Sequence, residues 1–137
     1  MATYPHLLHT VLDTTDARAL AEFYRELLGL RYREGDAPPE DGEETSPDWL
    51  VLVDADDRRK LAFQLVEELP ATTWPSPEVP MQLHLDMTVP DIEELEHQRQ
   101  RAEALGARLL LDESDDEEEP LYVFADLAGH PFCIFVS

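Results

Sequence analysis

The chain has 137 residues, enough for one domain with a sizeable core, and 43% of them are hydrophobic, as in ordinary globular proteins. Its 31 acidic and 10 basic residues give a net charge of −21, which argues against nucleic acid and anionic membranes as partners. Cys133 is the single cysteine, so no internal disulfide can form, and no signal-peptide or membrane-span pattern is present. We expect a soluble, cytoplasmic protein.

The first half of the chain is predicted to contain a strand, a helix and three further strands. An alternating stretch from residue 8 ends at Asp16, and a helical pattern follows that stops at Gly29. One apolar face of this helix is predicted to carry Leu20, Phe23, Leu27 and Leu28. The strands expected after the helix are 30–33, 49–55 and 60–66.

The second half repeats this order. Each half has a strand that begins with Leu-His, and an aspartate stands seven residues after the histidine: His9 and Asp16, then His84 and Asp91. Asp91 is a predicted helix N-cap, with Glu94 at the capping-box position. The helical stripe is expected to contain Ile92, Leu95, Ala102 and Leu105, with Gly106 as the stop. The strands expected after this helix are 107–111, 121–126 and 131–136.

Two acidic segments and one proline-rich segment connect these elements. Residues 34–48 and 112–119 hold seven acidic side chains each, lack apolar periodicity, and are expected to be solvated loops without the ligand spacing of an EF-hand. Residues 67–80 contain four prolines, which excludes a central strand or helix. We therefore predict one domain, 1–137, made of module 1 (5–66), a linker (67–80) and module 2 (81–136), whose sheets each bury one face.

Four polar or metal-capable residues fall on the first and last strands of the two modules. They are His9 and Gln64 in module 1, and His84 and Cys133 in module 2. If the two sheets curve around a common axis, these side chains could converge. Spacing alone also allows a simpler interpretation, in which a strand histidine is hydrogen-bonded in the core or rim and a buried cysteine acts as a small hydrophobe.

The stretches "VLDTTDARALAEFYRELLGL", "LAFQLVEE", "TWPSPEVPMQLHLDM" and "YVFADLAGHPFCIF" resemble the vicinal oxygen chelate superfamily. This superfamily includes glyoxalase I, bleomycin- and fosfomycin-resistance proteins and extradiol dioxygenases, and the chain looks most like its glyoxalase-like, actinobacterial-type members. The resemblance implies an α+β fold of two βαβββ modules, whose curved mixed sheets surround a shared cleft.

The resemblance also implies a divalent metal in that cleft, bound at the positions of His9, Gln64, His84 and Cys133. Gln64 and Cys133 lack the carboxylate that relatives use, which favours a metal-free site over one holding zinc, nickel, manganese or iron. A His, His, Cys set would suit zinc or copper. Asp13 and Asp86 share faces with the histidines and could supply a substitute base, or could bind backbone amides at the strand ends.

Five aromatic residues are candidates for lining the cleft: Trp49, Phe63, Trp74, Tyr122 and Phe124. The alternation of side chains along a strand does not determine which of these residues face the helices. Trp74 could instead anchor the linker on the core.

Three functions remain open at this stage. We expect a protein that binds a small aromatic or heterocyclic molecule in the cleft, without metal, as bleomycin-resistance proteins do. The alternative is a metal-dependent lyase or oxygenase acting on a substrate with vicinal oxygens. A third is a structural or regulatory protein with a closed cleft. The resemblance is also compatible with a homodimer.

Overall fold

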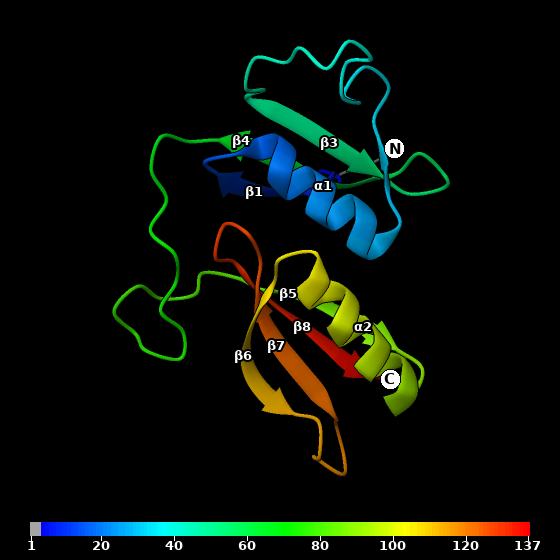
Figure 1. Cartoon of the computed structure of the whole chain (residues 1–137), viewed down its shortest axis with the longest axis vertical. Helices are drawn as coiled ribbons and strands as arrows, with labels where there is room; N and C mark the ends of the chain where they lie inside the picture. The colour runs from blue at the N-terminus through cyan, green and yellow to red at the C-terminus, as the bar shows by residue number, and fades with distance from the viewer. Residues whose placement is uncertain (1–3) are drawn as a thin grey trace. The chain divides into compact units, whose positions relative to one another are not determined.

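The computed structural model describes residues 4–137, which divide into two compact units, one ending at Leu69 and one spanning Pro70–Ser137. The first unit contains β1 (Thr10–Thr14), α1 (Ala17–Leu28), β2 (Arg31–Tyr32), β3 (Trp49–Val53) and β4 (Arg59–Leu65). The second contains β5 (Leu85–Val89), α2 (Ile92–Ala104), β6 (Arg108–Glu113), β7 (Leu121–Ala125) and β8 (Pro131–Val136) (Figure 1). The predicted order of strand, helix and three strands is confirmed in both units.

Each unit is built on a mixed four-stranded sheet. The strand orders are β1-β4-β3-β2 and β5-β8-β7-β6. β1 pairs with β4, and β5 with β8, in parallel, whereas the other neighbours are antiparallel. A parallel pair needs a long connection, and here the helix and two strands supply it. The first and last strands of each unit therefore lie side by side, although they are far apart in sequence. The predicted α+β fold of two βαβββ modules is confirmed.

Both helices begin and end where local chemistry predicts. The Asp16 carboxylate accepts a hydrogen bond from the Ala19 backbone N–H at 3.0 Å, and Asp91 accepts one from Glu94 at 2.8 Å. Each N-cap satisfies a backbone donor that has no partner within the helix. Gly29 ends α1 with φ of 67°, a left-handed conformation that glycine adopts without steric cost.

The predicted apolar stripes are correct except at the helix ends. Leu28, the last residue of α1, and Ile92, the first of α2, are exposed rather than buried. Helical side chains lean toward the N-terminus, so that of Ile92 projects beyond the start of its helix. Tyr24, which the sequence stripe omitted, is fully buried.

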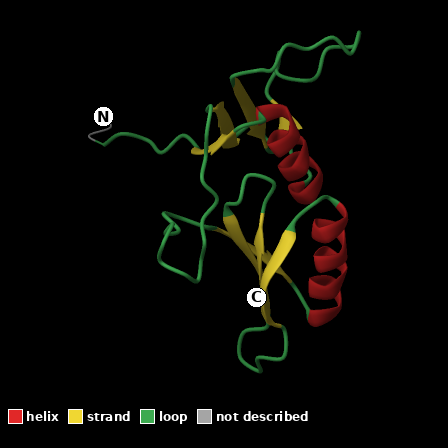
Figure 2. Cartoon of the chain, turned by 60° about the vertical axis from the view of Figure 1, so that its left-hand side comes forward, coloured by secondary structure: helices red, strands yellow, loops and turns green. Residues whose placement is uncertain are grey.

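Each helix packs on one face of the sheet in its own unit (Figure 2). Under α1, the buried rings of Tyr24 and Phe63 stack with centroids 6.1 Å apart. In the second unit, the Tyr122 hydroxyl donates to Glu96 of α2 at 2.7 Å, and Phe124 stacks on Phe132 at 5.2 Å. These contacts correct the expectation that Phe63, Tyr122 and Phe124 line a cleft. We call the other face of each sheet its helix-free face.

The first acidic loop is largely exposed, as its composition suggests, but contacts near its two ends attach it to the rest of the unit. Arg18, on α1, forms an ion pair with Glu44, donates to the backbone carbonyl of Asp36 at 2.7 Å, and lies 4.9 Å over the Tyr32 ring. The Asp36 carboxylate in turn accepts a hydrogen bond from the Val51 backbone N–H at 2.9 Å. These contacts hold residues 36–44 against the helix and β3, which the charge pattern alone did not predict.

No helix in the described part of the chain is long and apolar enough to cross a membrane.

The assignment of faces can be tested with two neighbouring residues of β4. We expect Phe63→Ala to lower the free energy of unfolding by about 3–5 kcal/mol, because it removes a fully buried ring beneath α1. Gln64→Ala, on the exposed opposite face, should change it by less than about 0.5 kcal/mol. Urea denaturation followed by circular dichroism measures both values. Equal losses from the two variants would contradict the assignment.

Candidate functional site

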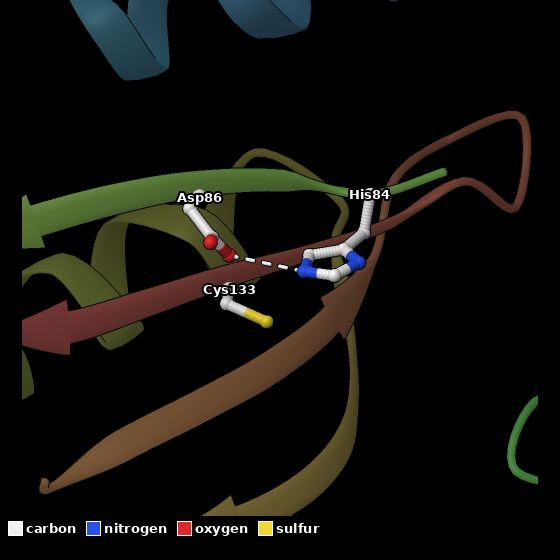
Figure 3. Close-up of side chains that lie close together, drawn as sticks. All are labelled: His84, Asp86 and Cys133. Atoms are coloured by element: carbon white, nitrogen blue, oxygen red, sulfur yellow. Dashed lines mark ion pairs between the residues drawn. The ribbon is translucent and has the colours of Figure 1, made fainter.

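Three metal-capable side chains gather on the helix-free face of the second unit. Asp86 on β5 and Cys133 on β8 are register partners in the parallel pair. His84 stands two residues before Asp86, so strand alternation gives it the same face. Phe132 and Ile134, on either side of Cys133, are buried on the opposite face. Figure 3 shows the three side chains together on one side of β5 and β8.

The side chains of this cluster are close enough to share one small ligand. His84 Nε2 lies 3.3 Å from Asp86 Oδ1. One nitrogen, one oxygen and one sulfur atom, from His84, Asp86 and Cys133, all lie within 4.8 Å of one another. The side chains of His84 and Asp86 are 41% and 55% exposed, and Cys133 is half-buried. The cluster is therefore open to ions and small molecules from solvent.

The Cys133 thiol is held in its protonated form. Burial, the negative charge of Asp86 and a hydrogen bond to the same carboxylate together raise its pKa to about 11. Burial is the largest of these causes, since a thiolate is poorly solvated there. Reactive cysteines instead have a lowered pKa and a positive neighbour. Cys133 is therefore not arranged as an activated nucleophile.

The donor atoms fit a divalent metal of borderline softness. Imidazole nitrogen, carboxylate oxygen and thiolate sulfur are the three ligand types that zinc uses in proteins. A bound cation would stabilise the thiolate and oppose the effect of Asp86 on the pKa. The set suits a hard ion such as magnesium or manganese less well, because those ions prefer oxygen ligands.

The helix-free face of the first unit carries a different group of side chains. The His9 and Trp49 rings lie 6.0 Å apart, and Trp49 is 36% exposed. Gln64 on β4 is the register partner of both Asp13 on β1 and Trp49 on β3, so these three form a row across the sheet. This face therefore combines an aromatic surface with amide, carboxylate and imidazole groups.

His9 is the unusual residue of this face. Its Nδ1 atom is buried and has no hydrogen-bond partner within residues 4–137. Burial lowers the pKa of His9, and the nearby positive charges of Arg59 and Arg33 lower it further. The imidazole is therefore neutral at physiological pH, with one nitrogen left without the partner that buried polar atoms nearly always have.

Strand pairing shows that the two faces are not chemically equivalent. Two residues after His84, Asp86 lies opposite Cys133. Two residues after His9, Val11 lies opposite Ala62. When positions are counted from the two histidines, Cys133 therefore corresponds to Ala62 and not to Gln64. Gln64 lies two residues after Ala62 on β4. The offset arises because the chain segments that connect the paired strands differ in length in the two units.

The remaining predicted residues have more local surroundings. Trp74 is half-buried in the 67–80 segment, and its backbone N–H donates to Thr72 Oγ1 at 3.2 Å; its proposed place in a cleft stays a prediction. His130 lies in the turn between β7 and β8, where its backbone N–H donates to the Asp126 carboxylate at 3.0 Å. Of the four residues implied as metal ligands, His84 and Cys133 are together in the second unit, and His9 and Gln64 belong to the first.

The sequence alone did not predict two features of these candidate sites. Asp86 was a candidate base, but the structure makes it the third donor beside His84 and Cys133. The His-x-Asp spacing on one strand was the available signal. The unpartnered Nδ1 atom of His9 had no such signal, because it depends on what packs around the ring.

Residues 9–135 match a family described as the Glyoxalase-like domain, and the chain therefore belongs to that family. Comparison with curated proteins gave no significant match. Nothing found distinguishes an actinobacterial subgroup, which stays a prediction.

Solved structures share the fold at low sequence identity. A glyoxalase/bleomycin resistance protein/dioxygenase family enzyme from Burkholderia phytofirmans has a TM-score of 0.68 and 18% identity, over 94% of this chain and 96% of that one. The fosfomycin resistance protein FosX from Mesorhizobium loti has a TM-score of 0.67 and 13% identity, over 98% and 94%. A FosX mutant from Listeria monocytogenes, complexed with Mn(II) and dihydroxypropylphosphonic acid, has a TM-score of 0.68 and 16% identity, over 100% and 94%.

The electrostatic influence of Asp86 on Cys133 is directly measurable. We expect Cys133 in the folded protein to react with iodoacetamide at neutral pH more slowly than in the urea-unfolded chain. Asp86→Asn should speed the folded-state reaction, because removing the negative charge lowers the thiol pKa and raises the thiolate fraction. Glu93→Gln, which removes the same charge from α2, is the control. Equal rates for both variants and the original protein would rule out this influence.

Proposed function

We propose that the protein binds a small aromatic or heterocyclic molecule on the helix-free face of the first unit. The observation that carries this proposal is the buried, unpartnered Nδ1 of His9 beside the partly exposed ring of Trp49. Together they offer one directional polar contact and one flat apolar surface, the usual ingredients of a small-molecule site.

The energetic argument starts from His9. A buried polar atom without a partner costs about 1–3 kcal/mol, and a ligand that supplies the hydrogen bond recovers this energy on binding. Because the imidazole is neutral, it can pair with an uncharged donor or acceptor on a heterocycle. A charged partner is not required.

The surrounding surface favours a ligand with a flat apolar body. Trp49 provides an aromatic plane on which another ring can stack. Gln64, beside Trp49, adds an amide that both donates and accepts hydrogen bonds. The apolar body and polar edge of an aromatic heterocycle match this combination.

A second candidate function is a metal-dependent lyase or oxygenase acting on a substrate with vicinal oxygens. The observation that favours it is the cluster of His84, Asp86 and Cys133. FosX from Listeria monocytogenes, with the same fold, was solved with Mn(II) and dihydroxypropylphosphonic acid. A bound metal would supply Lewis-acid stabilisation of negative charge on substrate oxygens. The two functions differ in a simple way, since ligand binding at His9 and Trp49 needs no metal.

A single-tryptophan protein tests the principal proposal. Trp74→Phe leaves Trp49 as the only indole, because the chain has two tryptophans. In EDTA, we expect members of an aromatic and heterocyclic fragment library to change Trp49 fluorescence saturably. Adding His9→Ala should weaken binding about tenfold or more, by loss of the hydrogen bond. His97→Ala, which removes an exposed histidine from α2, is the matched control and should leave affinity unchanged.

Two results would overturn the proposal. One is the absence of saturable binding by any fragment in the library. The other is binding that His9→Ala and His97→Ala leave equally intact. In either case the unpartnered nitrogen would not mark a ligand site.

A further inference from the structure

We propose that His84, Asp86 and Cys133 form a zinc site contained entirely in the second unit. This set differs from the one implied by resemblance, which took His9 and Gln64 from the first unit. It also goes beyond the proposed ligand site, with which it shares no residue.

The distances within the cluster are close to those of a coordinated ion. With zinc–ligand bonds of about 2.0–2.3 Å in a tetrahedron, neighbouring donor atoms lie about 3.5 Å apart. His84 Nε2 and Asp86 Oδ1 already have this spacing, at 3.3 Å. All three donors lie within 4.8 Å, so side-chain rotations that move atoms by about 1 Å complete the geometry.

The backbone fixes these positions before any ion binds. Asp86 and Cys133 are held as register partners by the parallel ladder of β5 and β8. His84 immediately precedes β5 and is drawn toward Asp86 by their contact. Because the ligands come from one sheet edge, binding does not require another segment to fold or move. Such preorganisation lowers the entropic cost of assembling a metal site.

The identities of the donors select zinc over harder ions. A set with one thiolate and one imidazole favours zinc over magnesium or manganese. Three protein ligands leave one tetrahedral position for water or an exogenous ligand, as in catalytic rather than structural zinc sites. The partial exposure of His84 and Asp86 leaves that position accessible.

The nearby charges also favour cation binding in the second unit over the first unit. Glu119 adds negative charge near Cys133, beyond that of Asp86, and the whole chain carries a net charge of −21. His9 instead experiences the positive charges of Arg59 and Arg33, which oppose a nearby cation. At the positions equivalent to Asp86 and Cys133, the first unit has Val11 and Ala62, which have no ligating atoms.

Cobalt(II) is a suitable spectroscopic probe of this site. The full chain is freed of metal with EDTA, dialysed, and titrated with Co(II) under reducing conditions. We expect one equivalent to bind, with a near-ultraviolet thiolate-to-cobalt charge-transfer band and the visible bands of four-coordinate Co(II). One equivalent of Zn(II) should displace the cobalt and remove both signals.

Matched variants separate this site from the set implied by resemblance. Cys133→Ser should abolish the charge-transfer band, and Asp86→Ala should weaken binding at least about a hundredfold, beyond the usual cost of losing an outer-sphere partner. His9→Ala and Gln64→Ala should preserve both stoichiometry and spectrum. Circular dichroism confirms folding of each variant, and His84→Gln provides a second ligand substitution if Cys133→Ser is unfolded.

Each alternative outcome contradicts the proposal. A protein that binds no cobalt, or binds it without a thiolate band, has no such site. Loss of binding in His9→Ala or Gln64→Ala would mean that the ligands come from both units. Because fragment binding is measured in EDTA, failure of the zinc site leaves the proposed ligand site intact, and the reverse also holds.

Discussion

Each sheet is covered by a single helix, so every strand residue faces either that helix or the opposite side. This alternation separates the two tasks of each strand. On β4, Phe63 packs under α1 while its neighbour Gln64 is exposed. On β8, Phe132 is buried while its neighbour Cys133 stands beside Asp86. In both pairs the aromatic residue belongs to the core beneath the helix, and its polar or sulfur-containing neighbour lies on the helix-free face.

The parallel strand pair at one edge of each sheet brings side chains from distant parts of the sequence together on the helix-free face. It places β1 beside β4 and β5 beside β8, although about fifty residues separate the paired strands. In the second unit the result is a nitrogen, an oxygen and a sulfur donor within a few ångströms. In the first unit, the equivalent positions are Val11 and Ala62, which carry no donor atoms. The polar and aromatic groups of that face are instead His9 and Trp49. The same supersecondary arrangement therefore presents two different sets of side chains in the two units, for which we propose two different ligands.

Local signals in the sequence predicted the helices and strands, but not the register of the paired strands or the tertiary contacts between segments. The N-cap of Asp91 and the stop at Gly29 depend on neighbouring residues, and both are confirmed. Which face Phe63 and Tyr122 share with the helix could not be predicted, since alternation fixes relative but not absolute orientation. The register that matches Cys133 with Ala62 depends on loop lengths and strand pairing. The salt bridge from Arg18 to Glu44 and the unpartnered nitrogen of His9 likewise depend on tertiary packing.

The central proposal is that the two helix-free faces bind different ligands, and that all protein ligands of the zinc ion come from the second unit. The most direct test is a crystal structure of the full chain with zinc, using anomalous scattering at the zinc edge. The account predicts a single strong peak about 2.0–2.3 Å from His84 Nε2, an Asp86 carboxylate oxygen and Cys133 Sγ. A zinc ion coordinated by His9 or Gln64, or the absence of zinc from the second unit, would contradict it.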